Sequence, residues 1–504
     1  MLADRSAGGR ATERILLCAW LLAATLSVSD SSVAQGWPQY AGNAAGERYS
    51  TLDQINRDNV EDLDVAWIYR TGEPERRGDV WDFSMFQNTP ILLPEAAGGS
   101  LIVCSPFNRI IALDPATGTE RWVFEPEVPL DNWMPYTCRG VTAWTDADAV
   151  AESACANRLF FGTNDARVFS IDARTGERCS GFGDDGEIRI NIGKEEEIRG
   201  EVKITSPPAV INDTVVFGTF VRDMLRIDAP SGRVRAFDAR TGELKWTFDA
   251  VPRDPDDPAA SSWHGDSAQT VGGANVWSLM SVDEARDLVF LPTTSPSVDF
   301  YGGHRPGDNR YANSVVALRG STGELVWHFQ VVHHDLWDYD IASQPVLVDM
   351  PIDGTMVPAV AQATKQGFLF LLHRETGEPL FPVEERPVPQ ISVDTEWVSP
   401  TQPYPSAPPP LIPQGLAPDD AWGFTWFDRR SCRQKIEAYR SEGLYTPPSV
   451  EGTVLMPSSM GGANWGSLAH DPSRRLVVVN TNRVPAIVKL IPREEVPGAD
   501  TRDD

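Results

Sequence analysis

Three groups of residues have types and spacings that could do chemistry. Gly181, Gly183 and Gly186 fit the GxGxxG spacing of a dinucleotide-binding turn. The adjacent His333 and His334 carry imidazoles of the kind that bind transition metals. The chain also holds six cysteines, which could bind zinc or form disulfides. The surrounding sequence argues against a nucleotide site and against either metal site.

Asp184 and Asp185 lie inside the glycine pattern, where they would repel a pyrophosphate, and no helical pattern follows. Neighbouring residues on a strand point to opposite faces, so His333 and His334 are not expected to share a metal ion. We expect them to flank a turn instead. The cysteine spacings contain no CxxC, which disfavours a zinc site.

The N-terminus predicts export. A stretch with three arginines precedes the apolar run 15–28, and residues 32–34 would suit cleavage before Gln35. We predict a signal peptide over residues 1–34 and a periplasmic protein. An uncleaved anchor is the alternative, although the run is short for a bilayer span of about 20 residues.

Cleavage there would remove Cys18 and leave five cysteines, an odd number, so at least one is free or pairs elsewhere. The remaining five are Cys104, Cys138, Cys155, Cys179 and Cys432. Export permits disulfides, but the sequence does not reveal their pairing.

The composition is acidic and rich in turn residues. The 504 residues include 44 Lys and Arg against 71 Asp and Glu, a formal net charge of −27. Such a surface repels nucleic acid and anionic membranes, so any anionic ligand needs a local basic cluster. Forty Gly, forty Pro and sixteen Trp favour many short strands over long helices.

A repeat indicates how those strands are organised. The pattern Ala-x-Asp-x-x-x-Gly-x-x-x-Trp covers residues 112–122 and 236–246, and 317–327 with Arg in the Asp position. Two weaker copies contain Asp172 and His373. The Asp can hydrogen-bond turn amides, the Gly supplies a positive φ, and the Trp can pack on the neighbouring unit. Five copies predict an all-β propeller of four-stranded sheets.

The repeat resembles the tryptophan-docking motif of the PQQ-dependent dehydrogenases, where PQQ is pyrroloquinoline quinone. The resemblance runs from Trp37 to Arg493 and is greatest to the catalytic domain of the membrane-bound quinoprotein glucose dehydrogenases. It rests on short strings, of which HHDLWD is the most specific: WPQYAG (37–42), TCRGV (137–141), TSPP (205–208), HHDLWD (333–338), TPPS (446–449) and KLIPR (489–493). It implies an eight-bladed propeller with PQQ on its axis.

The resemblance assigns four main roles. Asp338 matches the general base that takes the substrate's hydroxyl proton, and Lys365 matches a lysine bonded to the quinone oxygens. Trp277 matches the aromatic floor under the cofactor, and Arg139 an arginine that pairs with a PQQ carboxylate. Taken singly, Asp338 could be a turn residue or ion-pair partner, Lys365 an exposed lysine and Trp277 a core residue.

Thr205 and Ser206 are expected to offer hydroxyls to the same carboxylates. Asn480 matches an Asn near the substrate pocket, with an ordinary strand-end Asn as the equal alternative. These three assignments are the least specific of the cofactor site.

The predicted metal site differs from the ligand pattern that the resemblance implies. The resemblance implies Ca²⁺ (or Mg²⁺) bound by an adjacent Asp-Asn pair, but this chain has Asp223 followed by Met224, a poor calcium ligand. Ser295 or Asp299 could compensate. We therefore predict Asp223 as a metal ligand within an incomplete set.

Two further departures bear on function. The vicinal Cys pair of the methanol dehydrogenase branch is absent, which favours the glucose dehydrogenase branch. After the propeller domain, predicted over residues 35–493, only the polar tail 494–504 follows, whereas the resemblance implies roughly two more blades. We therefore expect an open ring with exposed strand edges, which invite aggregation and put the activity of this chain alone in doubt.

The sequence thus predicts PQQ-dependent oxidation of an aldose sugar, a polyol or another alcohol. Electrons would pass to a respiratory quinone or an electron-carrier protein, and association with the membrane periphery is left open. A PQQ alcohol dehydrogenase is one alternative. Another is a non-catalytic propeller that acts as an envelope scaffold, which would have no need of Asp338, Lys365, Arg139 and Trp277 together.

Overall fold

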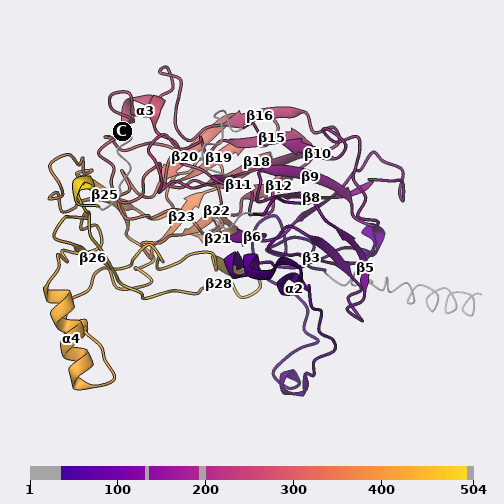
Figure 1. Cartoon of the computed structure of the whole chain (residues 1–504), viewed down its shortest axis with the longest axis horizontal. Coiled ribbons are helices and arrows are strands. Elements are labelled where there is room, and N and C mark those ends of the chain that lie inside the picture. The colour runs from indigo at the N-terminus through magenta and orange to yellow at the C-terminus, as the bar shows by residue number, and fades with distance from the viewer. Residues whose placement is uncertain (1–35, 131–134, 192–199, 497–504) are drawn as a thin grey trace, which may run out of the picture.

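The computed structural model describes residues 36–130, 135–191 and 200–496, in which β-strands predominate (Figure 1). The predicted signal peptide and most of the predicted polar tail lie outside these residues. The described helices are α2 (Glu73–Arg77), α3 (Ser267–Thr270) and α4 (Trp426–Glu437). Between them lie the short 3-10 helices Val60–Asp62, Gly78–Phe83, Glu95–Ala97, Ala260–Ser262, Glu284–Arg286, Pro418–Asp420 and Arg493–Glu495. None of the described helices is long and apolar enough to cross a bilayer.

Four antiparallel sheets of four strands follow one another along the chain. The first has β2 (Ile91–Leu92), β3 (Leu101–Cys104), β4 (Ile110–Leu113) and β5 (Glu120–Phe124). The second has β7 (Thr142–Thr145), β8 (Asn157–Gly162), β9 (Arg167–Asp172) and β10 (Glu187–Arg189). The third has β12 (Ala209–Ile211), β13 (Thr214–Phe217), β15 (Val234–Asp238) and β16 (Leu244–Phe248). The fourth has β17 (Ser281–Asp283), β18 (Leu288–Pro292), β19 (Ser314–Arg319) and β20 (Leu325–Gln330).

Smaller sheets complete the fold. A three-stranded sheet has β21 (Val346–Ile352), β22 (Thr355–Ala363) and β23 (Leu369–His373). The antiparallel pairs are β11 (Val202–Lys203) with β14 (Phe220–Val221), β24 (Val383–Pro387) with β25 (Thr401–Pro405), β26 (Thr453–Leu455) with β29 (Ala486–Val488), and β27 (Leu468–Asp471) with β28 (Leu476–Val479). One parallel pair joins β1 (Ser84–Met85) to β6 (Tyr136–Thr137).

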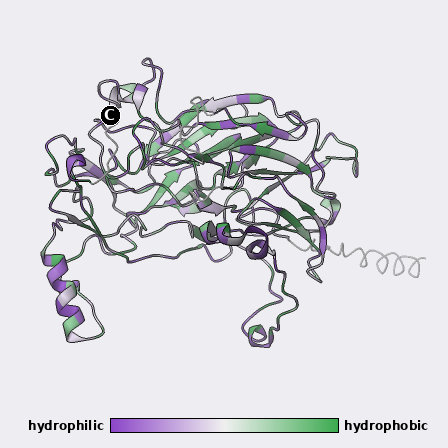
Figure 2. Cartoon of the chain, in the orientation of Figure 1, coloured by the Kyte–Doolittle hydropathy of each residue, from purple (hydrophilic) through white to green (hydrophobic). Residues whose placement is uncertain are grey.

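The hydrophobic cores lie between successive sheets. Ile102 and Ile110 of the first sheet pack with Phe161 and Phe169 of the second, and a further cluster joins the third sheet to the fourth. Apolar residues accordingly follow the strands, whereas α4 projects from the body and is mostly hydrophilic (Figures 1 and 2). The predicted all-β class is confirmed. None of the sheets in the described residues closes on itself, so the eight blades remain a prediction.

The repeated tryptophans dock as the sequence predicts. A Cβ atom added to Gly176 would lie 2.5 Å from the Trp122 ring, and one added to Gly323 would lie 2.7 Å from the Trp246 ring. The Trp246 indole also donates a hydrogen bond of 2.8 Å to the carbonyl of Gly320. Each indole therefore lies on a glycine of the next unit, where any side chain would displace it. The same contact joins Trp67 to Gly118 and Trp327 to Gly377.

The aspartates of the repeat stabilise its turn. The Asp114 carboxylate accepts hydrogen bonds from the amides of Ala116 and Thr117, at 3.0 and 2.9 Å. Asp172 and Asp238 do the same in their copies. Where Arg319 replaces the Asp, Asp287 accepts from the Ser321 amide instead, at 3.0 Å.

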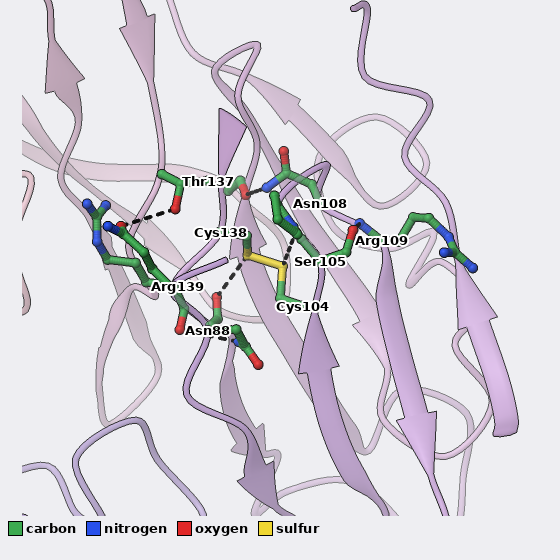
Figure 3. The surroundings of a disulfide bond; sticks show 12 residues. Asn88, Cys104, Ser105, Asn108, Arg109, Thr137, Cys138 and Arg139 are labelled. Carbon is green, nitrogen blue, oxygen red and sulfur yellow. Dashed lines mark hydrogen bonds between the residues drawn. A yellow bond between two sulfur atoms is a disulfide. The ribbon is translucent and has the colours of Figure 1, made fainter. Parts of the chain in front are cut away.

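Two disulfides form, Cys104–Cys138 and Cys155–Cys179, and among the cysteines that the structure describes Cys432 of α4 is free. Figure 3 shows that the first disulfide ties the segment carrying Arg139 to the end of β3. The segment also follows β6 directly, so both a covalent bond and a strand pairing position Arg139.

Candidate active site

A buried carboxylate builds the turn that presents Asp338. Asp335 is 1% exposed, and its side chain accepts hydrogen bonds from the amides of Trp337 (2.9 Å) and Tyr339 (2.7 Å). The Ser295 hydroxyl donates to the same carboxylate at 2.6 Å. Within this turn Asp338 has a φ of +57°, a left-handed conformation that non-glycine residues rarely adopt. The turn thus positions the predicted base by hydrogen bonds rather than by helix or sheet.

Lys365 contacts Asp338 directly, although the sequence predicted for it only a role at the quinone oxygens. Its ammonium group donates to the Asp338 backbone carbonyl at 2.7 Å and to the Asp338 carboxylate at 2.9 Å. The Asp340 carboxylate lies 3.9 Å away, itself held by the Ser295 amide at 2.8 Å. Lys365 is 4% exposed and belongs to the tight turn between β22 and β23. An ion pair between a buried lysine and a partly buried aspartate therefore forms the centre of this half of the site.

The pKa values in this cluster are shifted strongly. Burial raises the pKa of Asp338 well above its usual range, and Lys365 opposes that rise while Asp340 and Asp299 add to it. Burial and then the carboxylates of Asp340 and Asp338 raise the pKa of Asp223. Burial alone would lower the pKa of Lys365, but Asp338 and Asp340 outweigh it and raise that pKa. The carboxyl groups of Asp338 and Asp223 consequently hold protons more tightly than exposed ones do.

The structure brings only part of the predicted metal site together. The carboxylate of Asp223 helps to raise the pKa of Asp299, so the two side chains lie close together. Met224, in contrast, is 63% exposed to solvent. The Ser295 hydroxyl is engaged by Asp335. Within the described ranges, no three His, Cys, Asp or Glu side chains form a group that could hold a metal ion. Calcium therefore stays a prediction that rests on Asp223.

The second half of the site is a cationic cavity. The Arg139 guanidinium donates to the Thr205 hydroxyl at 2.6 Å and lies 3.8 Å from the Trp465 ring centroid. Burial lowers the pKa of Arg139 to about 10, and Tyr40 opposes that shift; no carboxylate of the described residues does so. The cavity, of about 80 Å³, is lined by Met85, Pro135, Thr137, Arg139, Lys203, Thr205, Phe220 and Trp277.

Trp277 forms a wall of this cavity. The Ser206 hydroxyl donates to the Trp277 backbone carbonyl at 2.5 Å, so Ser206 fixes the segment that carries the indole. The Trp277 indole N–H is buried and has no hydrogen-bond partner in the described chain. Trp465 packs edge-on against the Trp277 ring, with centroids 5.0 Å apart. A buried, unpartnered donor beside a buried arginine is the environment that an anionic, aromatic ligand would satisfy.

One loop connects the two halves. Gly461 lies against Lys365, where an added Cβ would come within 2.7 Å of the lysine side chain. Four residues later, Trp465 covers Arg139. The exposed Asn480 packs its amide against Gly466 in the same loop. All of the predicted site residues thus gather in one region.

Sequence analysis missed several residues that neighbour the predicted site. Asp340 is two residues after Asp338, and Lys203 two residues before Thr205, so alternation along an extended chain was a usable signal for both. Trp465 had no such signal, because the loop that carries it meets Arg139 only through the tertiary fold.

The two adjacent histidines do not lie on a strand, which corrects the prediction, because β20 ends at Gln330. His333 lies beside Glu385 and His334 beside Glu396, at 3.1 and 3.2 Å. Their rings therefore diverge toward different carboxylates and flank the Asp335 turn, as expected.

Comparison with known proteins identifies the family. Residues 37–504 match the PQQ family described as glucose/ethanol/alcohol dehydrogenase, beta-propeller domain. The chain belongs to this family. It is 37% identical to the quinoprotein glucose dehydrogenase of Escherichia coli K12 over 480 residues, which cover 93% of this chain and 59% of that protein. The glycerol dehydrogenase large subunit of Gluconobacter oxydans is 38% identical over 474 residues, 93% of this chain and 62% of that subunit.

The fold has solved counterparts. The crystal structure of the quinohemoprotein alcohol dehydrogenase from Comamonas testosteroni superposes with a TM-score of 0.64 at 24% sequence identity. The superposition covers 91% of this chain and 59% of that chain. This PQQ-family chain therefore spans about three fifths of the length of the relatives described above.

Proposed function

We propose that this chain is a PQQ-dependent dehydrogenase that oxidises a CH–OH group of a sugar, a polyol or another alcohol. One observation carries the proposal: the ion pair of partly buried Asp338 with buried Lys365 lies in the same region as a buried arginine pocket walled by Trp277. The names of the relatives, which include glucose and glycerol dehydrogenases, support the same reaction class.

The residues present fit the cofactor's chemistry. Arg139 is a buried cation with no carboxylate partner among the described residues, and the Trp277 indole N–H lacks an acceptor. PQQ brings three carboxylates and a flat aromatic system, and when bound it accepts the hydride equivalent from the substrate. Arg139 and the Thr205 hydroxyl would bind a carboxylate, while Trp277 would supply an aromatic face.

Trp465 would have to move for the cofactor to enter. The cavity of about 80 Å³ is smaller than the roughly 300–1,000 Å³ of most small-molecule sites. Trp465 both covers the Arg139 guanidinium and abuts Trp277. Its displacement would open the space over Arg139.

Asp338 would act as the general base. Its carboxylate would accept the hydroxyl proton of the substrate, and its raised pKa makes it a stronger base than an exposed Asp. Lys365 would hold the Asp338 carboxylate in place through its 2.9 Å hydrogen bond. The buried Asp335 network would keep the turn in the strained conformation that presents the base.

Three further assignments belong to this proposal. Asp223, with Asp299, would bind Ca²⁺ or Mg²⁺ once their carboxylates are ionised. Asn480 would lie at the substrate side of the loop that carries Trp465. Export to the periplasm would place the enzyme where it can pass electrons to a respiratory quinone or an electron-carrier protein.

Dye reduction by the purified chain loaded with PQQ and Ca²⁺ tests the proposal. Glucose, glycerol, quinate and ethanol would be offered in turn, beside the variant Asp338→Asn and, as a matched control, Asp114→Asn at a partly exposed turn residue. We expect reduction that depends on at least one substrate, is lost in Asp338→Asn and persists in Asp114→Asn. Equal rates with and without every substrate would refute the proposed activity.

A further inference from the structure

Four aromatic side chains are exposed where the loop before α4 meets the first turn of that helix. They are Trp422, Phe424, Trp426 and Phe427, which are 66%, 90%, 64% and 75% exposed. Their rings pair two by two, Trp422 with Phe424 at 4.6 Å and Trp426 with Phe427 at 5.2 Å between centroids. Grouped apolar side chains on a protein surface mark a site of interaction. We call these four residues the aromatic tip.

The aromatic tip is the part of α4 that lies farthest from the body. At the other end of the helix Ile436 is buried, and the chain then joins β26, where the Val454 amide donates to the Arg440 carbonyl at 2.8 Å. The N-terminal end of α4 therefore projects away from the sheets (Figure 1). A helix of 12 residues is about 18 Å long.

A capping box holds the aromatic tip in one conformation. The Thr425 amide donates to the Asp428 carboxylate at 3.0 Å, and the Asp428 amide donates to the Thr425 hydroxyl at 3.2 Å. Gly423 packs so closely on the backbone of Arg429 that a Cβ atom would not fit between them. The exposed rings are thus preorganised, which lowers the entropy cost of inserting them into a partner.

Basic side chains follow the aromatic tip by one helical turn. Arg429 and Arg430 are exposed, and Arg430 lies over the Trp426 ring at 5.4 Å from its centroid. Residues 422–435 contain four basic residues and one acidic residue, whereas the whole chain has a net charge of −27. This end of α4 is therefore complementary in charge to an anionic surface, although the rest of the chain is not.

We propose that the aromatic tip docks the protein on the surface of a bilayer that contains anionic lipids. Trp and Phe rings insert at the level of the headgroups, and arginines beside them bind the lipid phosphates. One helical turn is about 5.4 Å, which matches the roughly 5–10 Å that interfacial side chains penetrate. Because α4 itself is mostly hydrophilic, only its tip would enter the bilayer (Figure 2). The inference goes beyond the proposed function and does not depend on the cofactor.

The length of α4 reconciles this docking with the acidic body. Lipid phosphates repel the body, but a projection of about 18 Å exceeds the screening length of about 8 Å at physiological salt. Arg429 and Arg430 remain within that length of the lipid surface, so their attraction is retained. A flat protein surface fits less well, because a narrow tip would bury little area against it.

Flotation with vesicles tests the proposal. The purified chain would be mixed with vesicles of phosphatidylethanolamine and phosphatidylglycerol, or of phosphatidylcholine alone, beside Phe424→Ser/Phe427→Ser. The matched control is Val150→Ser/Met356→Ser, at residues that are 79% and 53% exposed elsewhere on the molecule. We expect the wild type and the control to bind the anionic vesicles, and the Phe variant to bind at least tenfold more weakly because it loses two buried rings.

Arg429→Gln/Arg430→Gln measures the contribution of charge. Arg433 stays unchanged, because it already pairs with Asp419 and Glu437 at 2.8 Å each. The double variant should bind the anionic vesicles about tenfold to thirtyfold more weakly, and its binding should depend less on KCl. Binding to phosphatidylcholine alone should change little.

Three results would overturn the inference. The first is a folded wild type that does not float with the anionic vesicles at low salt. The second is equal binding by the wild type and Phe424→Ser/Phe427→Ser. The third comes from sedimentation without vesicles: self-association of the wild type that is lost in the Phe variant, together with no flotation, would assign the aromatic tip to a second copy of the chain.

Discussion

Asp338 depends on its neighbours for the basicity that the proposed reaction needs. Burial and the carboxylates of Asp340 and Asp299 raise its pKa, while Lys365 keeps the carboxylate hydrogen-bonded. A carboxylate that is poorly hydrated and close to other negative charges binds a proton more tightly than an exposed Asp does. The residue-scale predictions follow from removing either the carboxylate or one of its neighbours.

Asp338→Asn removes the proton acceptor but keeps the size of the side chain and its contact with Lys365. We expect the rate of substrate oxidation to fall by about 10²–10⁴-fold, the usual contribution of a general base. Single-turnover reduction of the loaded enzyme measures that rate. PQQ affinity measured on the same sample should stay within a few-fold of the wild type, and a rate equal to the wild type's would exclude Asp338 as the base.

Asp340→Asn should shift the pH dependence. The base must be ionised to act, so activity rises as the pH rises through the raised pKa of Asp338. Asp340 raises that pKa by repulsion, hence its neutralisation lowers the pKa and moves the rising limb of the kcat profile to lower pH. A limb that moves to higher pH would contradict this electrostatic account.

At the scale of the elements, the tryptophan docking contacts hold neighbouring sheets together. Gly323 has a φ of +74° and leaves no room for a side chain beneath Trp246. Gly354 offers a matched control, since its φ is +83° and no atom lies within 4 Å of an added Cβ. The pair separates the cost of the backbone conformation from the cost of displacing the indole.

Gly354→Ala should lower the free energy of unfolding by about 1 kcal/mol, the cost of a left-handed backbone for alanine. Gly323→Ala should lower the free energy of unfolding by about 2–4 kcal/mol, because overpacking against Trp246 adds to the same backbone cost. Denaturant unfolding of both variants checks the difference. Equal decreases in the free energy of unfolding would mean that the docking contact contributes nothing to stability.

Sequence reasoning reached these elements because the repeat is local. The Asp, Gly and Trp of each copy lie within eleven residues, and their turn chemistry requires no knowledge of distant segments. Asp338 and Lys365 were found through the HHDLWD resemblance and its spacing. The position of Trp465 and the divergence of His333 from His334 were not predicted, because both depend on contacts between segments that are far apart in the sequence. The cysteine pairing likewise depended on the fold.

At the scale of the whole molecule, the Cys104–Cys138 disulfide ties the first sheet to the segment that carries Arg139. It closes a loop with a sequence separation of 34 residues. The double variant Cys104→Ser/Cys138→Ser should therefore lower the free energy of unfolding by about 4 kcal/mol on the chain-entropy model. Cys432→Ser, which removes a free thiol, should leave unfolding unchanged. A loss below 1 kcal/mol in the double variant would show that packing alone fixes this segment.

Binding of PQQ by the whole chain is the central claim, and a direct titration tests it. Purified protein would be titrated with PQQ in the presence of Ca²⁺, with the cofactor's absorbance as the signal and Arg139→Gln alongside. We predict saturable binding of one PQQ per chain, weakened at least tenfold by Arg139→Gln, which removes a charge-assisted hydrogen bond. A folded chain that leaves the PQQ spectrum unchanged at every concentration would contradict the account.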